Sequence, residues 1–408
     1  MRLRYSFRVY LTPGQCLCAR RVFGCVRTVW NDALAVQKRV KESNKLLGNP
    51  ASRLREGPYQ AIPRNQQLGK SLITEGKKTP ERTWLDNCPA PVMQQALRDL
   101  DKAWAAHEDS KQGKRPGPFV RPPTFKSKKD TRQSARFTAN SRFKILDDGH
   151  LRLPKIGDVE VRWSRDLPSS PSSVTLIKDS ADRWFVSFVV ETKPEDDALP
   201  PLDDDRDVGI DLGLTRFAVL SDGTHIQHPR FLKRAEKKLK REQSRLSRKQ
   251  KGSKNRDKQR RKVARAHVRV ADARRDFHHR WSSKLARENQ AASAESLSVR
   301  ALARGIHAKS VHDAGWASFL SMLAYKMTRY GRTFTKIARD FPSSQMCCRC
   351  GHRDGPKLLH VRQWTCPKCA TVLDRDWCAG TNIRTEGRRI RGVPVTAPPT
   401  PGPGARRR

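Results

Sequence analysis

The chain has 408 residues, of which 84 are Lys or Arg and 41 are Asp or Glu, so its formal net charge is +43 at pH 7. This length is enough for two to four compact units with cores of their own. No stretch approaches the 18 apolar residues of a membrane span, which excludes a helical membrane protein. The first residues alternate charged with apolar side chains and lack the apolar run of a secretion signal, so we expect a cytoplasmic protein.

The excess of positive charge predicts a polyanionic partner, because a free protein so charged repels itself. Nucleic acid is favoured, since binding to phosphates releases counterions. The basic residues recur along the whole chain and not in one amphipathic helix, which argues against an anionic membrane surface. A basic face that is merely solvated is the competing interpretation.

The N-terminal segment predicts a strand followed by a helix. Residues 2–11 alternate polar with apolar side chains. Thr12 then stands as N-cap, Pro13 at the first helical position and Gln15 three residues after the cap, which is a capping box. Apolar residues with helical spacing follow, so we expect a core-facing helix to about residue 44.

The next part of the chain predicts short helices, one longer helix and then strands. Residues 45–80 are polar and rich in Gly, Pro and Lys, which is typical of a loop region with short helices. Residues 90–109 again have a helical apolar stripe. The clearest strands are residues 172–180 and 183–192. The acidic, Pro-containing segment 193–205 follows them and is a candidate domain boundary.

The C-terminal half begins with residues 207–226, which predict three short strands joined as hairpins. Residues 231–280 carry 21 Lys and Arg against five acids. Two apolar stripes separated by "KGSKNR" predict a helical hairpin with a narrow apolar seam and a broad basic face. The Pro-rich, basic residues 391–408 are expected to be disordered.

Four of the ten cysteines form the pattern C-x2-C-x15-C-x2-C. Two such CxxC turns close a tetrahedron around Zn²⁺, and four thiolates leave no open position, so the predicted zinc is structural. Its ligands are Cys347, Cys350, Cys366 and Cys369. Cys348 has no predicted role. Four other cysteines lie in helical, apolar surroundings, and the simplest interpretation is that they are small buried hydrophobic residues: Cys16, Cys18, Cys25 and Cys88.

Three acids are candidates for metal-dependent chemistry. Asp211 lies between apolar strand residues and two glycines, Glu295 follows a run of small residues, and Asp376 begins a helix. Each has an ordinary interpretation: a strand-end turn, a helix surface, or a favourable helix N-terminus. Together, Asp-Glu-Asp supplies the hard oxygen ligands that two Mg²⁺ ions need for phosphodiester hydrolysis.

The segments "GIDLGLTRFAVLSDG", "ESL" and "SSQMCCRCG…WTCPKC…DRDWCAGTNI" resemble the three blocks of a RuvC-like nuclease domain of the RNase H fold. This domain is that of the TnpB family, the transposon-encoded RNA-guided nucleases of the IS200/IS605 type, and of the related miniature type V CRISPR effectors. Further segments resemble the family in the same order, from about residue 3 to residue 386. Two segments depart from its pattern, since residues 378–380 replace the usual Asn-Ala-Ala and the strand before Glu295 reads "AASA".

The resemblance implies roles for the candidate residues. Asp211, Glu295 and Asp376 match the three catalytic acids, which hold two Mg²⁺ ions and cut both DNA strands in turn at one site. The four cysteines match a zinc ribbon that holds one Zn²⁺ and contacts target nucleic acid. The ribbon is inserted just before the last acid in the family, which explains why metal ligands and a catalytic carboxylate are neighbours in the chain.

The resemblance also implies a multidomain fold of the α+β and α/β classes. We expect the following parts: a wedge β-barrel (1–20 and 126–205) interrupted by a helical recognition domain (21–125), a RuvC-like nuclease (206–345 and 371–390) with a basic helical hairpin (230–285), a zinc ribbon (346–370) and a disordered tail (391–408).

The partners that the resemblance implies are a guide RNA and a target DNA duplex, so the protein would work in the bacterial cytoplasm, on the nucleoid when bound to DNA. Base pairing with the guide selects the target, while the protein reads a short flanking motif. Candidate nucleic-acid contacts are Gln94, Gln95, Arg136, Thr138, Lys233, Lys237 and Arg241. The competing interpretation is that these are solvated polar residues.

Two other functions are compatible with the sequence. One is a guide-RNA-dependent DNA-binding regulator of the same fold with weak or no cleavage, which is how family members without the three acids act. The other is a zinc-ribbon protein that binds structured RNA. The sequence leaves open whether a transposon end or a CRISPR array encodes the guide, and whether the protein works as one copy or two.

Overall fold

The computed structural model describes residues 1–46, 60–358 and 360–394, and the chain divides into two compact units. The first unit is Met1–Thr192 and the second begins at Lys193. The division falls where the acidic segment 193–205 begins. None of the helices in the described ranges is long and apolar enough to cross a bilayer.

The first unit is built on a seven-stranded antiparallel sheet with the strand order β2-β6-β7-β1-β5-β4-β3. The N-terminal strand β1 pairs with β7 over eight residues, and its inward side chains Tyr5, Phe7 and Val9 are buried. The predicted strands at residues 2–11, 172–180 and 183–192 are therefore confirmed. The strand bounds are β1 (Arg2–Tyr10), β2 (Gln133–Thr138), β3 (Lys144–Ile145), β4 (Leu151–Leu153), β5 (Gly157–Arg162), β6 (Ser173–Lys178) and β7 (Trp184–Glu191).

The predicted capping box is present at the start of α1 (Pro13–Leu46). The Gln15 backbone N–H donates to the Thr12 hydroxyl at 3.3 Å, and the Thr12 N–H donates to the Gln15 side chain at 3.0 Å. The helix ends two residues beyond the predicted position. Its predicted core face is buried at every position: Val22, Val26, Val29, Trp30 and Ala33.

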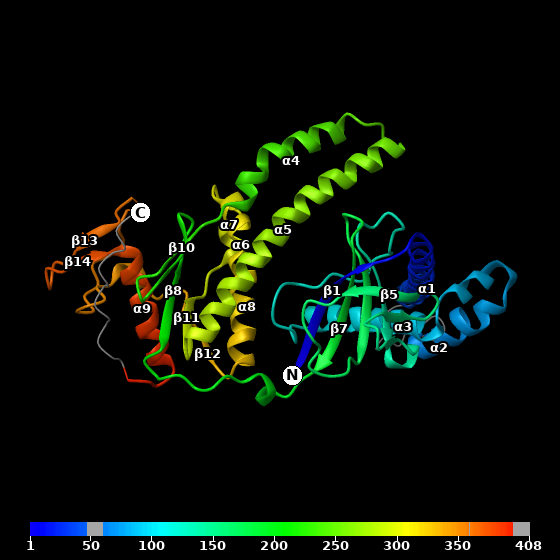
Figure 1. The fold of residues 1–408 in the computed structure, drawn as a ribbon, viewed down its shortest axis with the longest axis horizontal. Helices are drawn as coiled ribbons and strands as arrows, with labels where there is room; N and C mark the ends of the chain where they lie inside the picture. Colours follow the sequence, from blue (N-terminus) through cyan, green and yellow to red (C-terminus); the bar gives the residue numbers. More distant parts are fainter. Residues whose placement is uncertain (47–59, 359, 395–408) are drawn as a thin grey trace. The chain divides into compact units, whose positions relative to one another are not determined.

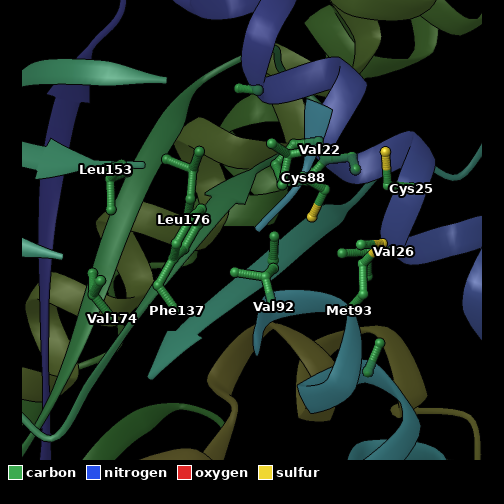
Figure 2. Packing of buried hydrophobic residues seen from close by; sticks show 14 of the residues in the cluster. Val22, Cys25, Val26, Cys88, Val92, Met93, Phe137, Leu153, Val174 and Leu176 are labelled. Carbon is green, nitrogen blue, oxygen red and sulfur yellow. The ribbon is translucent and has the colours of Figure 1, made fainter. Parts of the chain in front are cut away.

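Short helices and the longer helix α3 complete the first unit, as predicted for the described part of residues 45–111. They are α2 (Asn65–Gly69), η1 (Lys70–Glu75), η2 (Gly76–Lys78), η3 (Pro80–Asn87), α3 (Ala90–Lys111) and the single turn η4 (Ala139–Ser141). Figure 2 shows side chains of α1 and α3 meeting those of the sheet in one core. Cys25 and Cys88 are buried there as predicted, whereas Cys16 and Cys18 are half-buried at its margin.

The second unit is built on a five-stranded mixed sheet with the strand order β10-β9-β8-β11-β12 (Figure 1). β8, β9 and β10 are the three predicted hairpin strands and pair antiparallel, while β11 and β12 are parallel to β8. The strand bounds are β8 (Asp207–Leu212), β9 (Arg216–Leu220), β10 (His225–Gln227), β11 (Ala291–Glu295) and β12 (Thr333–Ile337).

Helices connect the parallel strands, and a small hairpin precedes the last helix. The remaining elements are η5 (Pro194–Asp197), α4 (Phe231–Ser247), α5 (Lys254–Glu288), α6 (Val299–Leu302), α7 (Ala308–Ala314), α8 (Trp316–Arg329), η6 (Ser343–Gln345), the hairpin strands β13 (Gln363–Thr365) and β14 (Val372–Asp374), and α9 (Arg375–Ile390). The predicted disordered tail lies outside the described residues from residue 395 onward. Residues 391 and 392 form a turn after α9, and residues 393 and 394 have no regular secondary structure.

The predicted basic hairpin is the pair α4 and α5, which lie side by side (Figure 1). Leu239, Ala266 and Val270 form its apolar seam. The seam is less apolar than predicted, because Glu242 and Gln259 are also buried in it. The Gln259 amide donates to the Glu242 carboxylate at 2.8 Å, so both polar groups are satisfied.

Candidate active site

Asp211 and Glu295 are brought together by the parallel pairing of β8 and β11. The register pairs Ala294 with Ile210, so the next residue on each strand is Glu295 and Asp211. Glu295 is the last residue of β11, and Asp211 is the last but one of β8. Because the carboxyl ends of parallel strands share one sheet edge, both carboxylates emerge at the same place. Glu295 accepts a short hydrogen bond from the Ser343 hydroxyl.

Asp376 reaches this edge from the first turn of α9. The N-cap is Asp374, whose side chain accepts from the Trp377 backbone N–H at 2.9 Å. The Trp377 indole N–H donates to the Ser221 carbonyl at 3.0 Å, which attaches the helix start to the turn after β9. Asp376 is therefore placed by two neighbours in sequence that have no part in the chemistry.

α9 lies at backbone distance from β8 and from the end of β9, because two glycines leave no side chain in the way. A Cβ atom on Gly209 would lie 2.0 Å from the Gly380 carbonyl oxygen, and one on Gly380 would lie 3.2 Å from the Ser221 nitrogen. Gly380 is one of the positions where the sequence departs from the family pattern. Both positions lie in close helix–strand contacts that a side chain would obstruct.

A buried carboxylate that the sequence analysis missed holds the other half of α9. Asp207, 8% exposed, accepts from Arg384, from Arg391 at 2.8 Å and pairs with Arg388 at 3.2 Å. The sequence carries a signal for this cluster, since the three arginines recur at helical spacing on one face. The sequence analysis placed Asp207 at the start of the predicted strand segment 207–226 but gave this carboxylate no role.

The three acids line one cavity of about 560 Å³ together with four arginines. The Arg362 guanidinium donates to both carboxylate oxygens of Asp376, at 3.1 and 3.2 Å, and to the Thr215 hydroxyl at 3.4 Å. The mouth of the cavity therefore combines carboxylates with cations that suit a phosphate. The arginines are Arg216, Arg230, Arg362 and Arg375.

The electrostatics of the cavity identify Asp211 as its central carboxylate. Burial raises the pKa of Asp211 to about 8, and the negative charges of Glu295 and Asp376 contribute in the same direction. Arg375 and Arg362 lower this pKa without offsetting the increase. A site in which like charges oppose one another is stabilised by a cation.

The spacing of the acids differs from that of the cysteines. Among the described residues, the four predicted zinc ligands are the one group of three or more metal-binding side chains whose ligand atoms all lie within 4.8 Å of one another. The three carboxylates are therefore spread more widely than a single compact ligand shell. Two-metal sites hold their ions about 3.5–4 Å apart, which requires a wider set of carboxylates than one ion does.

The cysteine cluster fits a zinc ion. The Sγ atoms of Cys347 and Cys369 are 3.6 Å apart, as are those of Cys350 and Cys366. Zinc–sulfur bonds of about 2.3 Å in a tetrahedron give sulfur–sulfur distances of about 3.8 Å. Hydrogen bonding with the side chain and backbone of Thr371 lowers the pKa of the Cys369 thiol to about 6, which favours the thiolate.

Cys348 and Cys378 lie next to this cluster without belonging to it. The Cys348 backbone N–H donates to the Cys378 sulfur at 3.1 Å, and that sulfur contacts the Met346 carbonyl at 3.2 Å. Asn382 also donates to the Met346 carbonyl, at 2.8 Å. Cys378, the first departure from the family's Asn-Ala-Ala, thus joins α9 to the first CxxC turn.

The candidate nucleic-acid contacts of the first unit differ in accessibility. Gln94 is exposed, but Gln95 is buried and its amide donates to Asp99 at 2.9 Å. Arg136 pairs with the same Asp99 at 3.4 Å, and Thr138 forms a capping box with the short helix that follows it. Gln94 is the member of this group with a free surface.

The candidate contacts of the second unit lie on α4, where Lys233, Lys237 and Arg241 are all exposed. Arg241 lies 3.6 Å from the carboxylate of Glu242. The charges on this helix are therefore available to solvent, as a phosphate-binding face requires.

Comparison with known families gives three matches along the chain. Residues 187–305 match the OrfB_IS605 family, described as "Probable transposase". Residues 316–383, which include the cysteine cluster and the start of α9, match the Cas12f1-like TNB domain. Residues 1–45 match the helix-turn-helix domain of the OrfB_IS605 family. The first two matches contain all three candidate acids.

Similar proteins extend over nearly the whole chain. A protein of Streptomyces pristinaespiralis named "Putative RNA-guided DNA endonuclease" is 39% identical over 387 residues, covering 94% of this chain and 89% of its own length. InsQ of Escherichia coli K12, with the same description, is 28% identical and covers 96% and 94%.

Among solved structures, a Cas12f1 chain in complex with single-guide RNA and target DNA has a TM-score of 0.53 at 14% identity. It covers 91% of this chain and 82% of its own length, and at this identity the likeness concerns the fold alone. The resemblance predicted from the three sequence blocks is confirmed by these matches. The chain belongs to the TnpB family.

Proposed function

We propose that the protein is an RNA-guided DNA endonuclease that hydrolyses phosphodiester bonds at a single RuvC-like site. The observation that carries the proposal is the meeting of Asp211, Glu295 and Asp376 in one cavity, from two parallel strands and a helix far apart in the sequence. The names of the relatives and the guide RNA and target DNA in the Cas12f1 complex support the same activity.

Asp211, Glu295 and Asp376 would hold two Mg²⁺ ions, and their carboxylate oxygens suit that metal. When bound, the two ions supply an activated water and stabilise the leaving 3′ oxygen of the cut strand. Asp211 has the strongest reason to bind a cation, since burial and two neighbouring negative charges act on it. Its proton leaves when the metal binds.

The arginines of the cavity would bind and orient the scissile phosphate. Arg362 pairs with Asp376 and is exposed, so it can exchange this carboxylate for a phosphate oxygen when a cation neutralises the acid. Arg375 and Arg216 offer further positive charge at the same rim. A planar guanidinium binds two phosphate oxygens at once, which fixes the orientation of the strand.

The cysteine cluster would hold one structural Zn²⁺, because four thiolates complete the tetrahedral shell. β14 ends at Asp374 and α9 begins at Arg375, so the metal-held hairpin is continuous with the helix that carries Asp376. We propose that this ribbon contacts the target strand while it positions the third acid.

The rest of the chain would bind guide RNA and recognise the target. We propose that the sheet of the first unit forms the wedge domain, and that α1, α3 and the short helices between them form the recognition domain that reads a flanking motif. The exposed cations of α4 and α5 suit the backbone of an RNA or an RNA–DNA heteroduplex.

The test uses the purified complex with its own RNA. The RNA that co-purifies is sequenced, a matching DNA duplex is synthesised, and cleavage is measured in Mg²⁺. We expect wild-type complex to cut this duplex and leave an unmatched one intact. Asp211→Ala should lose cleavage by at least about a thousandfold, the scale for loss of an essential catalytic group, and should still bind the matched duplex.

The control is Asp222→Ala, which removes a carboxylate from the exposed turn between β9 and β10. This variant should cut at nearly the wild-type rate. Cutting by Asp211→Ala at the wild-type rate would contradict the assignment of Asp211 as a catalytic residue. Binding of a matched duplex without any cutting by wild type in Mg²⁺ or Mn²⁺ would identify the protein as a guided regulator instead.

A further inference from the structure

A second cavity, of about 490 Å³, lies beside the three acids. We propose that it receives one unpaired nucleobase of the DNA strand being cut, next to the scissile phosphate. This inference rests on the proposed function and assigns a subsite to it. The cavity is continuous with the catalytic one, because the two share the residues Leu214, Glu295, Leu297, Leu302, His307 and Trp316.

The wall of the second cavity suits the flat, largely apolar face of a base. Leu297, Leu302 and Val311 contribute aliphatic side chains. Leu302 is 43% exposed and Ile306 is 96% exposed, so apolar surface lies open around the entrance. Of the four arginines and three acids that line the catalytic cavity, Glu295 alone also lines the second one.

Trp316 adds an aromatic side chain to the wall between the acids and the second cavity. It lines both cavities and is 3% exposed, so a small part of its ring surface is available to a base. Aromatic side chains commonly stack with unpaired bases. Ser298, His307 and Arg339 add further polar groups to the lining.

The position of Glu295 determines which base could enter the second cavity. Glu295 borders both cavities, so a strand whose phosphate lies at the acids has its neighbouring sugar at the entrance of the second cavity. The base on that sugar can enter only when it is unpaired, as it is in a strand displaced by guide pairing. The pocket would therefore hold a single strand in register and would disfavour an intact duplex at the site.

The experiment removes one base at a time. The guided complex is given matched duplexes in which one nucleotide near the cut is replaced by an abasic residue. We expect one position to slow wild-type cutting about tenfold, equivalent to about 1.4 kcal/mol, and the other positions to change it little. Leu302→Asp places a charge at the entrance and should cut the normal duplex about tenfold more slowly, with no further loss at that abasic position.

Ile390→Ala is the matched control, because Ile390 is similarly exposed, at 47%, and lines neither cavity. It should keep the wild-type rate and the wild-type response to the abasic position. If an abasic residue slowed cutting by wild type equally at every position, the proposed pocket would be overturned. The proposed function would stand in that case, because the complex would still cut the matched duplex.

A second readout does not depend on cutting. The fluorescent base 2-aminopurine is placed at the sensitive position, and binding is followed with the Asp211→Ala complex. Entry into the cavity next to Trp316 should quench the fluorescence, and Leu302→Asp introduced into the same complex should restore it. Unchanged fluorescence on binding would overturn the base pocket, even if the wild-type complex cuts DNA. Quenching without any cutting by wild type would overturn the proposed function alone.

Discussion

At the scale of single residues, the raised pKa of Asp211 predicts how metal binding depends on pH. Its folded pKa of about 8 means that the carboxyl group is mostly protonated at pH 7 without metal. A cation must displace this proton, so Mg²⁺ affinity should rise about tenfold per pH unit below pH 8 and level off above it. Calorimetric titrations in buffers of different ionisation enthalpy would count the released proton. Affinity that is constant from pH 6 to pH 9 would contradict this.

The sequence predicted the candidate metal ligands better than it predicted their surroundings. The CxxC pairs are specific because the spacing alone fixes four ligands, and the structure brings all four together. The acids could be assigned from the resemblance, whereas Arg362 and Ser343, their partners, could not. These contacts join segments that are far apart in the chain, and no local pattern marks them. The burial of Gln95 was missed for another reason, because its partner Asp99 is only one helical turn away but the helix pattern does not show which face is buried.

At the scale of elements, the close approach of β8 and α9 is the contact that assembles the site. Gly209→Ala would place a methyl group 2.0 Å from the Gly380 carbonyl oxygen. Backbone blocks this position, so we expect a loss of at least about 2–3 kcal/mol in the free energy of unfolding and a large loss of cleavage. Gly14→Ala, with nothing within 4 Å, is the control and should leave thermal unfolding almost unchanged. Wild-type stability of Gly209→Ala would contradict the packing.

The four-cysteine cluster and the β13–β14 hairpin should depend together on zinc for their structure. Cys366→Ser removes one of four ligands, so we expect zinc content to fall from about one ion per chain to nearly none. Cleavage should fall with it, because the hairpin leads directly into α9. Cys348→Ser should keep its zinc, since that residue lies outside the cluster. The zinc content of the purified variants is measured by metal analysis. Equal zinc content in Cys366→Ser and Cys348→Ser would contradict the assigned ligand set.

Elements were predicted from the sequence where local signals agreed. The capping box before α1, the alternation in β1 and the hairpin strands β8 to β10 all rest on short-range patterns. The weakest pattern was "AASAE", which lacks β-branched residues. It nevertheless forms β11, because its small side chains fit a central strand flanked by two parallel neighbours. Tertiary context overrides propensity there.

At the scale of the whole molecule, the two compact units have separate apolar cores. Every buried residue of the first core lies between Tyr5 and Val190, while the remaining clusters begin at Val208. We therefore expect a fragment of residues 1–192 to fold alone and to unfold cooperatively on heating. A fragment of residues 1–170 is the control, and it should not fold because it lacks β6 and β7. Non-cooperative melting of the longer fragment would contradict independent folding.

The net charge favours a nucleic-acid partner, but it does not assign the proposed roles to particular parts of the chain. Basic residues are spread over both units, so composition could not separate a guide-binding surface from a cutting site. That separation depends on where strands and helices converge. The order β10-β9-β8-β11-β12 brings Asp211 and Glu295 to one edge, where α9 adds Asp376, and only long-range pairing sets this order.

Asp207 and Arg384 are 177 residues apart, and their pairing joins the first strand of the second unit to its last helix. During synthesis, the strands of both sheets and the basic hairpin of α4 and α5 are therefore translated before α9. A nascent or prematurely terminated chain would carry the cationic surfaces and two of the acids without the third. We expect such products to bind nucleic acid without cutting it, because they lack Asp376, one of the three proposed metal ligands.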